Sequence, residues 1–167
     1  RKVGSATRNL RFASPVTHVS RPLDHAREPH EAYLKQFARL GASSLFLGMN
    51  PGPWGMSQTG VPFGEVQAVV SFLGVEGKVV SPKDAHPNRP IEGFSCAKSE
   101  VSGRRFWGLM QERFGIADAF AESHFVWNWC PLAFMEESGR NRTPDKLPAD
   151  ERGALTAPCD SCLRELV

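Results

Sequence analysis

The residues best suited to chemistry lie in a stiff loop that follows a short apolar run. The apolar residues 45–47 end at Gly48, and residues 49–64 then contain four glycines and three prolines. Proline has no amide donor and a fixed φ, and glycine allows unusual backbone angles and close approaches, so this segment is not regular helix or strand. Open α/β sheets place ligand sites in loops at the carboxyl ends of their strands. Asn50 and Phe63 are the candidate functional side chains of this loop.

A second asparagine, Asn128, follows another apolar, aromatic run. An amide is too weak to act as a strong general base, but it can hold a water molecule in line with a reacting carbon. It also offers both a donor and an acceptor to a ligand. The alternative for Asn50 is an Asx-turn that caps its loop, and for Asn128 a cap at the end of a strand. Residue type alone leaves both readings open.

Several segments, in order along the chain, resemble one protein family, the single-strand-selective monofunctional uracil-DNA glycosylases. The loop Gly-Met-Asn-Pro-Gly-Pro-Trp-Gly-Met resembles its active-site signature, Phe-Val-Trp-Asn-Trp-Cys-Pro-Leu its uracil-reading strand end, and Ser-Gly-Arg-Asn-Arg-Thr-Pro its DNA-contacting loop. The matching segments are residues 48–56, 58–65, 100–103, 105–108, 125–132 and 138–144. The resemblance extends from Pro22 to the last residues.

The resemblance implies a role for each candidate side chain. Asn50 is the catalytic residue, which positions the attacking water. Substrate-binding roles fall on Met49, Gly52, Phe63 and Asn128. Phe63 stacks on a base that has left the DNA helix, although a phenylalanine before a helix is more often part of a core. The amide of Asn128 matches the donor and acceptor edge of uracil, and Gly52 leaves room beside C5 of the pyrimidine.

The resemblance also implies that a polar loop contacts DNA. Arginines among small polar residues can donate to phosphates without reading sequence, whereas solvated turn residues are the alternative. The residues of this loop are Ser138, Gly139, Arg140, Asn141, Arg142 and Thr143. The expected partners are single- and double-stranded DNA that contains uracil or an oxidised or 5-substituted uracil.

The implied reaction is hydrolysis of the N-glycosidic bond of uracil and of 5-substituted uracils, which initiates base-excision repair. The base must first be extruded from the stack. These motifs contain no lysine that could form a Schiff base with the sugar. This absence agrees with a monofunctional enzyme, which removes the base and leaves the DNA backbone uncut.

One family motif has no counterpart here. The family's His-Pro-Ser-Pro-Arg-Asn segment supports charge on the departing uracil, and none of the five histidines lies in such a motif. We therefore interpret the chain as incomplete at its carboxyl end, and expect residues 1–167 alone to be poorly soluble or partly unfolded and weakly active. A non-catalytic remnant that binds DNA or uracil is the alternative. An unrelated α/β domain that binds a small molecule is a third reading.

Composition is that of an ordinary globular domain. The 167 residues are 41% hydrophobic with a net charge of +2, and no apolar run approaches the ~20 residues that span a bilayer. We expect an intracellular monomer without membrane contact, in the nucleus of a eukaryote or the cytoplasm and nucleoid of a bacterium. Residues 1–21 carry basic and no acidic side chains, which indicates either a phosphate-attracting arm or a solvated terminus, before a domain at 22–167.

The cysteines favour neither a disulfide scaffold nor a metal site. Cys159 and Cys162 have the spacing of zinc ligands, but no second cysteine or histidine pair follows them. Three residues apart on a helix, the two thiols share a face and are expected to pack inward. We expect no metal and no cofactor.

The pattern of elements predicts an α/β fold. Helices are expected at residues 28–39, 65–73, 102–114 and 149–167, and strands at 43–48, 78–80 and 124–129. Ser102 is the expected N-cap of its helix, and Pro158 is expected to interrupt the last one. Strands that alternate with helices indicate a three-layer α/β/α sandwich around a central, mainly parallel sheet, whose last strand lies outside the chain.

Overall fold

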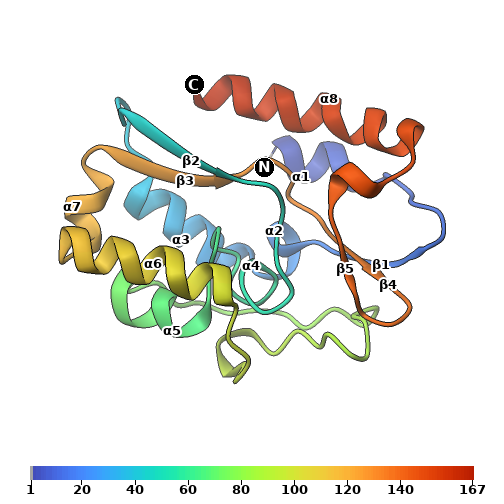
Figure 1. Ribbon diagram of the computed structural model, residues 1–167, viewed down its shortest axis with the longest axis horizontal. Helices are drawn as coiled ribbons and strands as arrows, with labels where there is room; N and C mark the ends of the chain where they lie inside the picture. Colours follow the sequence, from blue (N-terminus) through green and yellow to red (C-terminus); the bar gives the residue numbers. More distant parts are fainter. Residues whose placement is uncertain (1) are drawn as a thin grey trace.

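The computed structural model describes residues 2–167 and has a mixed α/β fold (Figure 1). The strands are β1 (Val16–Ser20), β2 (Ser44–Gly48), β3 (His124–Asn128), β4 (Ala133–Glu136) and β5 (Asn141–Arg142). The α-helices are α1 (Lys2–Thr7), α2 (Pro22–His25), α3 (Arg27–Phe37), α4 (Met56–Thr59), α5 (Val66–Ala68), α6 (Val101–Phe114), α7 (Ala117–Ala121) and α8 (Ala149–Leu166). Shorter turns are the π-helix η1 (Val69–Leu73) and the 3₁₀ helices η2 (Gly93–Ser95) and η3 (Pro144–Lys146).

A parallel pair, β2 and β3, forms the middle layer. Its register sets Ser44 opposite His124 and Gly48 opposite Asn128, so both strands end at one edge. Helix α8 lies on one side of the pair, and α6 and α7 lie on the other (Figure 1). The parallel pairing agrees with the predicted fold class.

The burial of β2 differs from the prediction of a buried strand. Every residue of β3 is buried except the first, whereas Phe46 and Leu47 of β2 are 36% and 48% exposed. An apolar run by itself does not show whether its strand is central or at an edge. Here β2 pairs only with β3 within the described residues.

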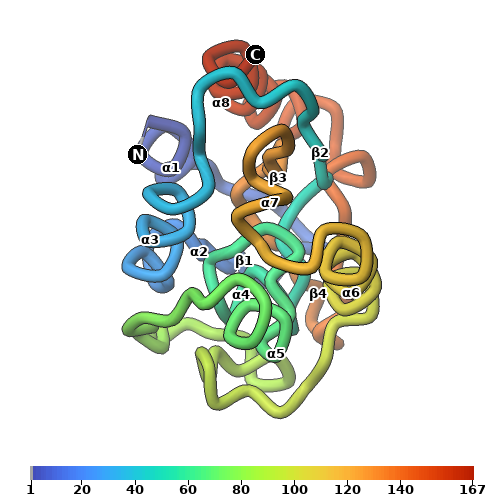
Figure 2. The backbone as a smooth tube through the Cα atoms, turned by 90° about the vertical axis from the view of Figure 1, so that its left-hand side faces the viewer, coloured from blue at the N-terminus to red at the C-terminus, as the bar shows by residue number. Residues whose placement is uncertain are grey.

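A second, antiparallel sheet of order β1-β4-β5 was not expected from the sequence. Residues 2–20, expected as a basic arm, contribute to it: Ser20 of β1 lies opposite Ala133 of β4, and α1 packs against α8 (Figure 2). Val3 and Val16 are buried, while Lys2 pairs with Glu165 at 3.0 Å on the surface. The boundary between residues 21 and 22 stays a prediction, although the segment before it packs against later elements.

The core lies between the two layers of helices and is built on large buried side chains. Trp107 of α6, Tyr33 of α3 and Phe134 of β4 are almost fully buried. The hydroxyl of Tyr33 donates to the carbonyl of Val126 at 2.9 Å, which satisfies its polar end and fixes α3 against β3. Burial raises the pKa of Tyr33, so this phenol stays a donor.

Three local predictions were wrong. Residues 78–80 form no strand, because only Val80 makes a backbone bond, at 2.8 Å to His25, and no ladder neighbour lies beside it. Helix α6 begins after Glu100 rather than at Ser102. Pro158 lies inside a continuous α8, because Leu155 and Cys159 are buried on the core and hold the helix on both sides of it.

The expected helix at 65–73 is present as α5 followed by η1, and it ends at Gly74 with a φ of 64°. Helix α3 and helix α6 match their predicted ranges to within two residues. None of the helices in the described residues combines the length and the apolar composition needed to cross a membrane.

Candidate active site

A cavity of about 390 Å³ opens at the carboxyl ends of β2 and β3. It brings together the predicted catalytic residue and all four predicted substrate-binding residues. Its lining includes Met49, Asn50, Gly52, Phe63 and Asn128. Its size lies within the range of about 300–1,000 Å³ that is usual for small-ligand sites.

Two backbone hydrogen bonds join the loops that leave the strands. The amide of Trp129 donates to the carbonyl of Gly48 at 2.9 Å, and the amide of Cys130 donates to Met49 at 2.9 Å. These bonds continue the parallel ladder beyond β2 and β3, so the segments that carry Asn50 and Asn128 are held side by side.

Gly48 allows the Asn128 amide and the Phe63 ring to pack closely against the end of β2. A Cβ atom at this position would overlap the amide oxygen of Asn128 and would lie 2.9 Å from Cε2 of Phe63. Real Cβ atoms do not approach other atoms so closely, so glycine is required for both side chains to meet here. Gly48 was not among the predicted site residues, although a glycine before Asn50 at a strand end was a usable signal.

The amide of Asn50 is held by main-chain carbonyls. Its Nδ2 donates to the carbonyls of Leu132 and Pro51, each at 3.3 Å. Oδ1 makes no hydrogen bond within residues 2–167, so it can accept one from a water molecule. These bonds hold the Asn50 amide in one orientation. The bond to Leu132 joins residues 82 positions apart in the sequence.

Asn128 is only 6% exposed and lies against Met56. Its Nδ2 donates to the thioether sulfur of Met56 at 3.1 Å. Sulfur is a weak acceptor, so a ligand oxygen can compete for this donor. The amide therefore keeps both a donor and an acceptor available to a polar ligand.

Phe63 is placed by a strained turn and an aromatic neighbour. Its φ of 53° lies in the left-handed region, which is uncommon for a bulky residue and is a feature often found at functional sites. Its ring stacks on Phe106 at 5.0 Å with an interplanar angle of 25°. Gly103 packs under the Phe63 carbonyl, where a Cβ would overlap it. One ring face is thus supported by α6 while the ring edge reaches Gly48.

Glu100 also lines the pocket, and sequence reasoning gave it no role. Its carboxyl group lies over Gly52 and Gly55, where a Cβ at either position would collide with it. The Ser102 hydroxyl donates to Oε1 at 3.2 Å. Burial raises the pKa of Glu100, while the Ser102 hydroxyl and the amide of Trp54 oppose that shift. The space above Gly52, which the sequence suggested was open, is therefore partly filled by a carboxyl group.

The predicted DNA-contacting loop forms the β4–β5 hairpin and a short extension. Gly139 has a φ of 80°, as the tight turn requires. Arg140 is exposed. The Arg142 guanidinium makes its bonds within the protein. It pairs with Glu136 at 2.9 Å and donates to the Lys146 carbonyl. The two arginines of this loop are therefore not equivalent.

The remaining polar residues of the loop also differ. Ser138 is exposed and Thr143 is half-buried. Asn141 lines the pocket, and its Oδ1 is buried without a hydrogen-bond partner in the described chain. Asn141 was predicted to contact DNA as part of the loop, and its position connects the loop to the pocket itself.

A segment that carries no predicted site residue holds the hairpin in place. Nε of Arg89 donates to the Gly139 carbonyl at 2.8 Å, and its guanidinium lies 5.0 Å from the ring centre of Trp54. His86 donates from Nε2 to the Glu137 carbonyl at 2.9 Å. Trp54 lines the pocket, so Arg89 links the hairpin to the Gly-Pro loop.

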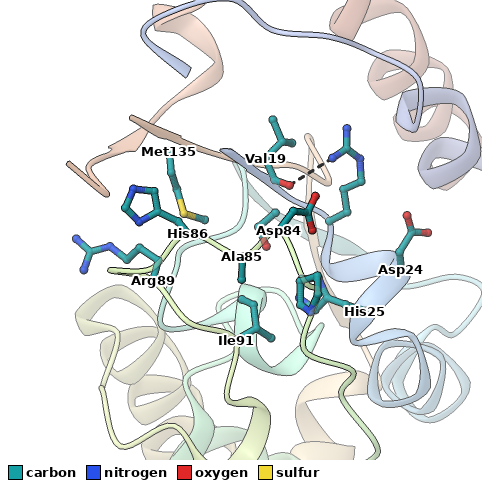
Figure 3. A pocket seen from close by; sticks show the side chains of 12 residues that line it. Val19, Asp24, His25, Asp84, Ala85, His86, Arg89, Ile91 and Met135 are labelled. Carbon is teal, nitrogen blue, oxygen red and sulfur yellow. Dashed lines mark hydrogen bonds between the residues drawn. The ribbon is translucent and has the colours of Figure 1, made fainter. Parts of the chain in front are cut away.

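A second cavity, of about 200 Å³, lies on the other side of this segment (Figure 3). His86 and Arg89 lie on one side of it, and His25 and Asp24 on the other. His25, His86 and Arg89 each donate to a backbone carbonyl, in the case of His25 from Nε2 to Ser57 at 2.8 Å, whereas Asp24 accepts from the Arg8 side chain at 2.7 Å. None of the predicted site residues lines this cavity.

The cysteines are free thiols. Cys159 is buried against Cys130, and this contact together with burial raises the pKa of Cys159. Cys162, one helical turn later, is partly buried. No group of three or more His, Cys, Asp or Glu side chains in residues 2–167 is arranged to hold a metal ion.

The fold and the pocket define an α/β protein with a cavity at its strand ends, of a size usual for a small-ligand site. Among solved structures, the chain is similar to a Pedobacter heparinus protein titled SMUG2, with a TM-score of 0.63 and 22% identity over 99% of this chain and 68% of that one. That likeness establishes the fold. No protein-family model matches the chain.

Curated relatives carry the closer likeness. The chain is 49% identical over 154 residues to the single-strand selective monofunctional uracil-DNA glycosylases of mouse and rat, covering 92% of this chain and 55% of each relative. It is 46% identical over 162 residues to that of cattle, covering 97% and 60%. The chain is therefore a homologue of the single-strand-selective monofunctional uracil-DNA glycosylases, which confirms the resemblance of its motifs, and it spans a little over half the length of these relatives.

Proposed function

We propose that the protein is a monofunctional uracil-DNA glycosylase that hydrolyses the N-glycosidic bond of uracil and of 5-substituted uracils in DNA, and so initiates base-excision repair. The observation that carries this proposal is the assembly of Asn50, Phe63 and Asn128 around one cavity. These residues come from segments almost 80 positions apart, and each has the chemistry that the reaction needs.

In this mechanism the base leaves the DNA stack and enters the pocket. Phe63, supported from behind by Phe106, stacks on it. Stacking on an aromatic ring is worth about 1–3 kcal/mol per base. Asn128 donates and accepts at the polar edge of the base, and cytosine mismatches this amide because it presents an amino donor where uracil has a carbonyl.

Asn50 then orients the attacking water. Because its Nδ2 is held by the Leu132 carbonyl, Oδ1 is the atom that accepts a hydrogen bond from the water. The water oxygen bonds to the anomeric carbon and loses a proton to solvent, while the electrons of the C–N bond leave with the base. The transition state has oxocarbenium character, so orientation contributes more than proton abstraction.

The departing base carries negative charge, and the pocket offers little to balance it. No lysine, arginine or histidine is among its lining residues in the described chain. This observation favours a second candidate function, a protein that binds uracil or DNA but turns over slowly.

The proposed macromolecular partner is DNA, single- or double-stranded, that contains uracil or an oxidised or 5-substituted uracil, contacted by the loop Ser138–Thr143. The protein acts on it as a monomer, in the nucleus of a eukaryotic cell or beside the nucleoid of a bacterial one.

The experiment is a base-release assay with uracil-containing oligonucleotides, followed by alkali. Free uracil together with alkali-labile sites supports the glycosylase, and a thymine-containing oligonucleotide is the control. Strand breaks before alkali contradict a monofunctional mechanism. Tight binding of the uracil oligonucleotide without release supports the second candidate.

A further inference from the structure

The carbonyl groups of three successive hairpin residues, 137–139, face donors from one tight turn, residues 86–89. Nε2 of His86 donates to the first carbonyl at 2.9 Å, and Nε of Arg89 donates to the third at 2.8 Å. Nδ2 of Asn88 makes a longer contact, of 3.5 Å, with the second. These contacts fix the tip of the β4–β5 hairpin relative to the turn.

Gly139 allows the turn to pack closely on the hairpin. A Cβ atom at this position would lie 3.2 Å from Cβ of Asn88 and 3.2 Å from Cε1 of His86, which is tighter than ordinary van der Waals contact. The turn is itself closed by two bonds. The amide of Asn88 donates to Nδ1 of His86 at 3.0 Å, and the amide of Arg89 donates to the His86 carbonyl at 2.8 Å. The hairpin therefore rests on an ordered piece of backbone.

The same turn is tied to the wall of the active-site pocket. The guanidinium of Arg89 lies 5.0 Å from the ring centre of Trp54, which lines the pocket. The next residue, Pro90, accepts a hydrogen bond at 2.9 Å from Nε2 of Gln58, and the same nitrogen donates to the Pro53 carbonyl at 2.8 Å. Gln58 is fully buried, so water does not compete for these bonds. The turn thus joins the hairpin to the Gly-Pro loop.

Two arginines meet at this junction, and their surroundings differ. Arg140 follows directly after the three held carbonyls, is exposed, and makes no ion pair with any of the residues 2–167. Arg89 is half-buried and donates to two carbonyls, those of Gly139 and, at 3.3 Å, Asn88. The first arrangement leaves a cation available to a phosphate, and the second uses its cation to hold the backbone.

We propose that Arg89 is a positioning residue, which holds the β4–β5 hairpin beside the base pocket so that Arg140 reaches a DNA phosphate while the base of the same strand is in the pocket. The proposal rests on the proposed function, in which the hairpin contacts DNA. Arg89 acts through the Gly139 carbonyl and the Trp54 ring, and it touches neither the base nor the phosphate.

The test is a double-mutant cycle of Arg89→Lys and Arg140→Ala, with affinity for a uracil-containing oligonucleotide measured by fluorescence anisotropy. Lysine keeps the positive charge of Arg89 but lacks the planar guanidinium that donates to Gly139 while lying against Trp54. We expect Arg89→Lys to weaken binding about fivefold in the wild-type background and less than about twofold in the Arg140→Ala background, because a displaced hairpin has already lost the Arg140 contact.

Two results would overturn the inference: no loss of affinity in Arg89→Lys, or the same loss in both backgrounds, which would show that Arg89 acts independently of the hairpin. Arg113→Lys is the matched control, since Arg113 also lies against an aromatic ring, 5.9 Å from the centre of Phe114, but in the last turn of α6. It is expected to change neither affinity. If Arg89→Lys does not fold, Arg89→Met, which keeps the apolar stem, replaces it with the same expectation.

If the wild type neither binds the oligonucleotide nor releases uracil from it, the proposed function fails. Hydrogen exchange then tests the hold on the hairpin separately, at the amides of Gly139 and Glu136, which bond across the hairpin at 2.8 and 3.0 Å. Exchange at least about fivefold faster in Arg89→Lys than in the wild type would support Arg89 as the residue that positions the hairpin. Equal exchange would refute it.

Discussion

At the scale of single residues, the two asparagines of the pocket are held in different ways. Asn50 donates to the main-chain carbonyl of Leu132, which fixes the direction of its amide. Asn128 donates to a thioether sulfur and is free to exchange that contact for a ligand. The first arrangement suits positioning of a water molecule, and the second suits reading of a base.

Asn50→Ala and Asn128→Ala are therefore expected to impair different steps, turnover in the first variant and binding of the base in the second. We expect Asn50→Ala to lower kcat by about 100-fold while binding of uracil-containing DNA survives, because orientation acts in the chemical step. Asn128→Ala should raise Kd and also weaken discrimination against cytosine. Single-turnover kinetics and fluorescence anisotropy separate the two effects, and Asn9→Ala, at an exposed position, is the control. Equal losses of binding in both variants would argue that the amides are only structural.

Gly48→Ala tests the close packing at the strand ends. The added methyl group would displace the Asn128 amide or the Phe63 ring, so we expect a loss of about 1–3 kcal/mol of stability together with weaker base binding. Urea unfolding and base titration measure the two. Gly153→Ala on α8 has nothing near its Cβ and should be neutral or stabilising by up to about 1 kcal/mol. If Gly48→Ala binds base as the wild type does, the close packing at Gly48 is not required for the site.

Some of the site could be predicted from the sequence and some could not. Asn50, Phe63 and Asn128 lie in long motifs whose residue types carry their chemistry. Glu100 lines the same pocket, but the sequence pattern assigns it no role, because its place there depends on the segment before α6 folding over Gly52, almost 50 positions earlier. Local patterns do not contain that contact.

At the scale of elements, the two arginines of the β4–β5 hairpin have different environments. Arg142 is about one-fifth exposed and pairs with Glu136, which ties the two strands together. Arg140 is exposed at the turn and makes no such pair with any of the residues 2–167. Arg140 lies in the turn before β5 whereas Arg142 lies within β5, so their environments differ.

Arg140→Ala and Arg142→Ala are therefore expected to separate DNA binding from stability. Arg140→Ala should weaken binding to DNA of any sequence and reduce the salt slope of log Kd by about one, since one phosphate contact is lost. Arg142→Ala should instead lower the free energy of unfolding by about 1 kcal/mol. Anisotropy across a salt series and urea unfolding of both variants measure this. The reverse pattern would contradict the assignment.

The elements also show where sequence patterns are sufficient. Helix α6 and the helix before Gly74 were predicted well, because apolar spacing and a terminal glycine act locally. The exposure of β2, the helical conformation at Pro158 and the β1-β4-β5 sheet depend on which distant segment packs against each residue. That information is tertiary, and the sequence pattern near each residue does not carry it.

At the scale of the whole molecule, two buried histidines make stability depend on pH. His25 donates to the Ser57 carbonyl and His30 to the Gly60 carbonyl, each at 2.8 Å. Burial lowers the pKa of both below the ordinary value of 6.5. The two imidazoles bind protons more readily in the unfolded chain than in the folded protein. A fall in pH therefore favours the unfolded chain.

The stability that these histidines contribute is therefore fully present above pH 6.5 and is lost as the pH falls through their lowered pKa values. We expect the melting temperature to fall between pH 7.5 and pH 5, as measured by circular dichroism. His30→Gln should reduce that slope, because it removes one of the two buried imidazoles. If the melting temperature of His30→Gln depends on pH as that of the wild type does, His30 does not contribute to the pH dependence of stability.

The register of β2 on β3 has a consequence for how the chain reaches its native state. Gly48 meets Asn128 only if two strands separated by 80 residues pair without a slip, and closing such a long loop is entropically costly. If the pocket at the strand ends binds a base, as proposed, the base would have affinity for that pairing and none for a slipped one. By mass action a ligand at 100 times its Kd would add about 2.7 kcal/mol to the correctly registered state. Free base added during refolding would therefore favour the correct strand alignment, and this stabilisation would grow with the logarithm of the base concentration divided by its Kd.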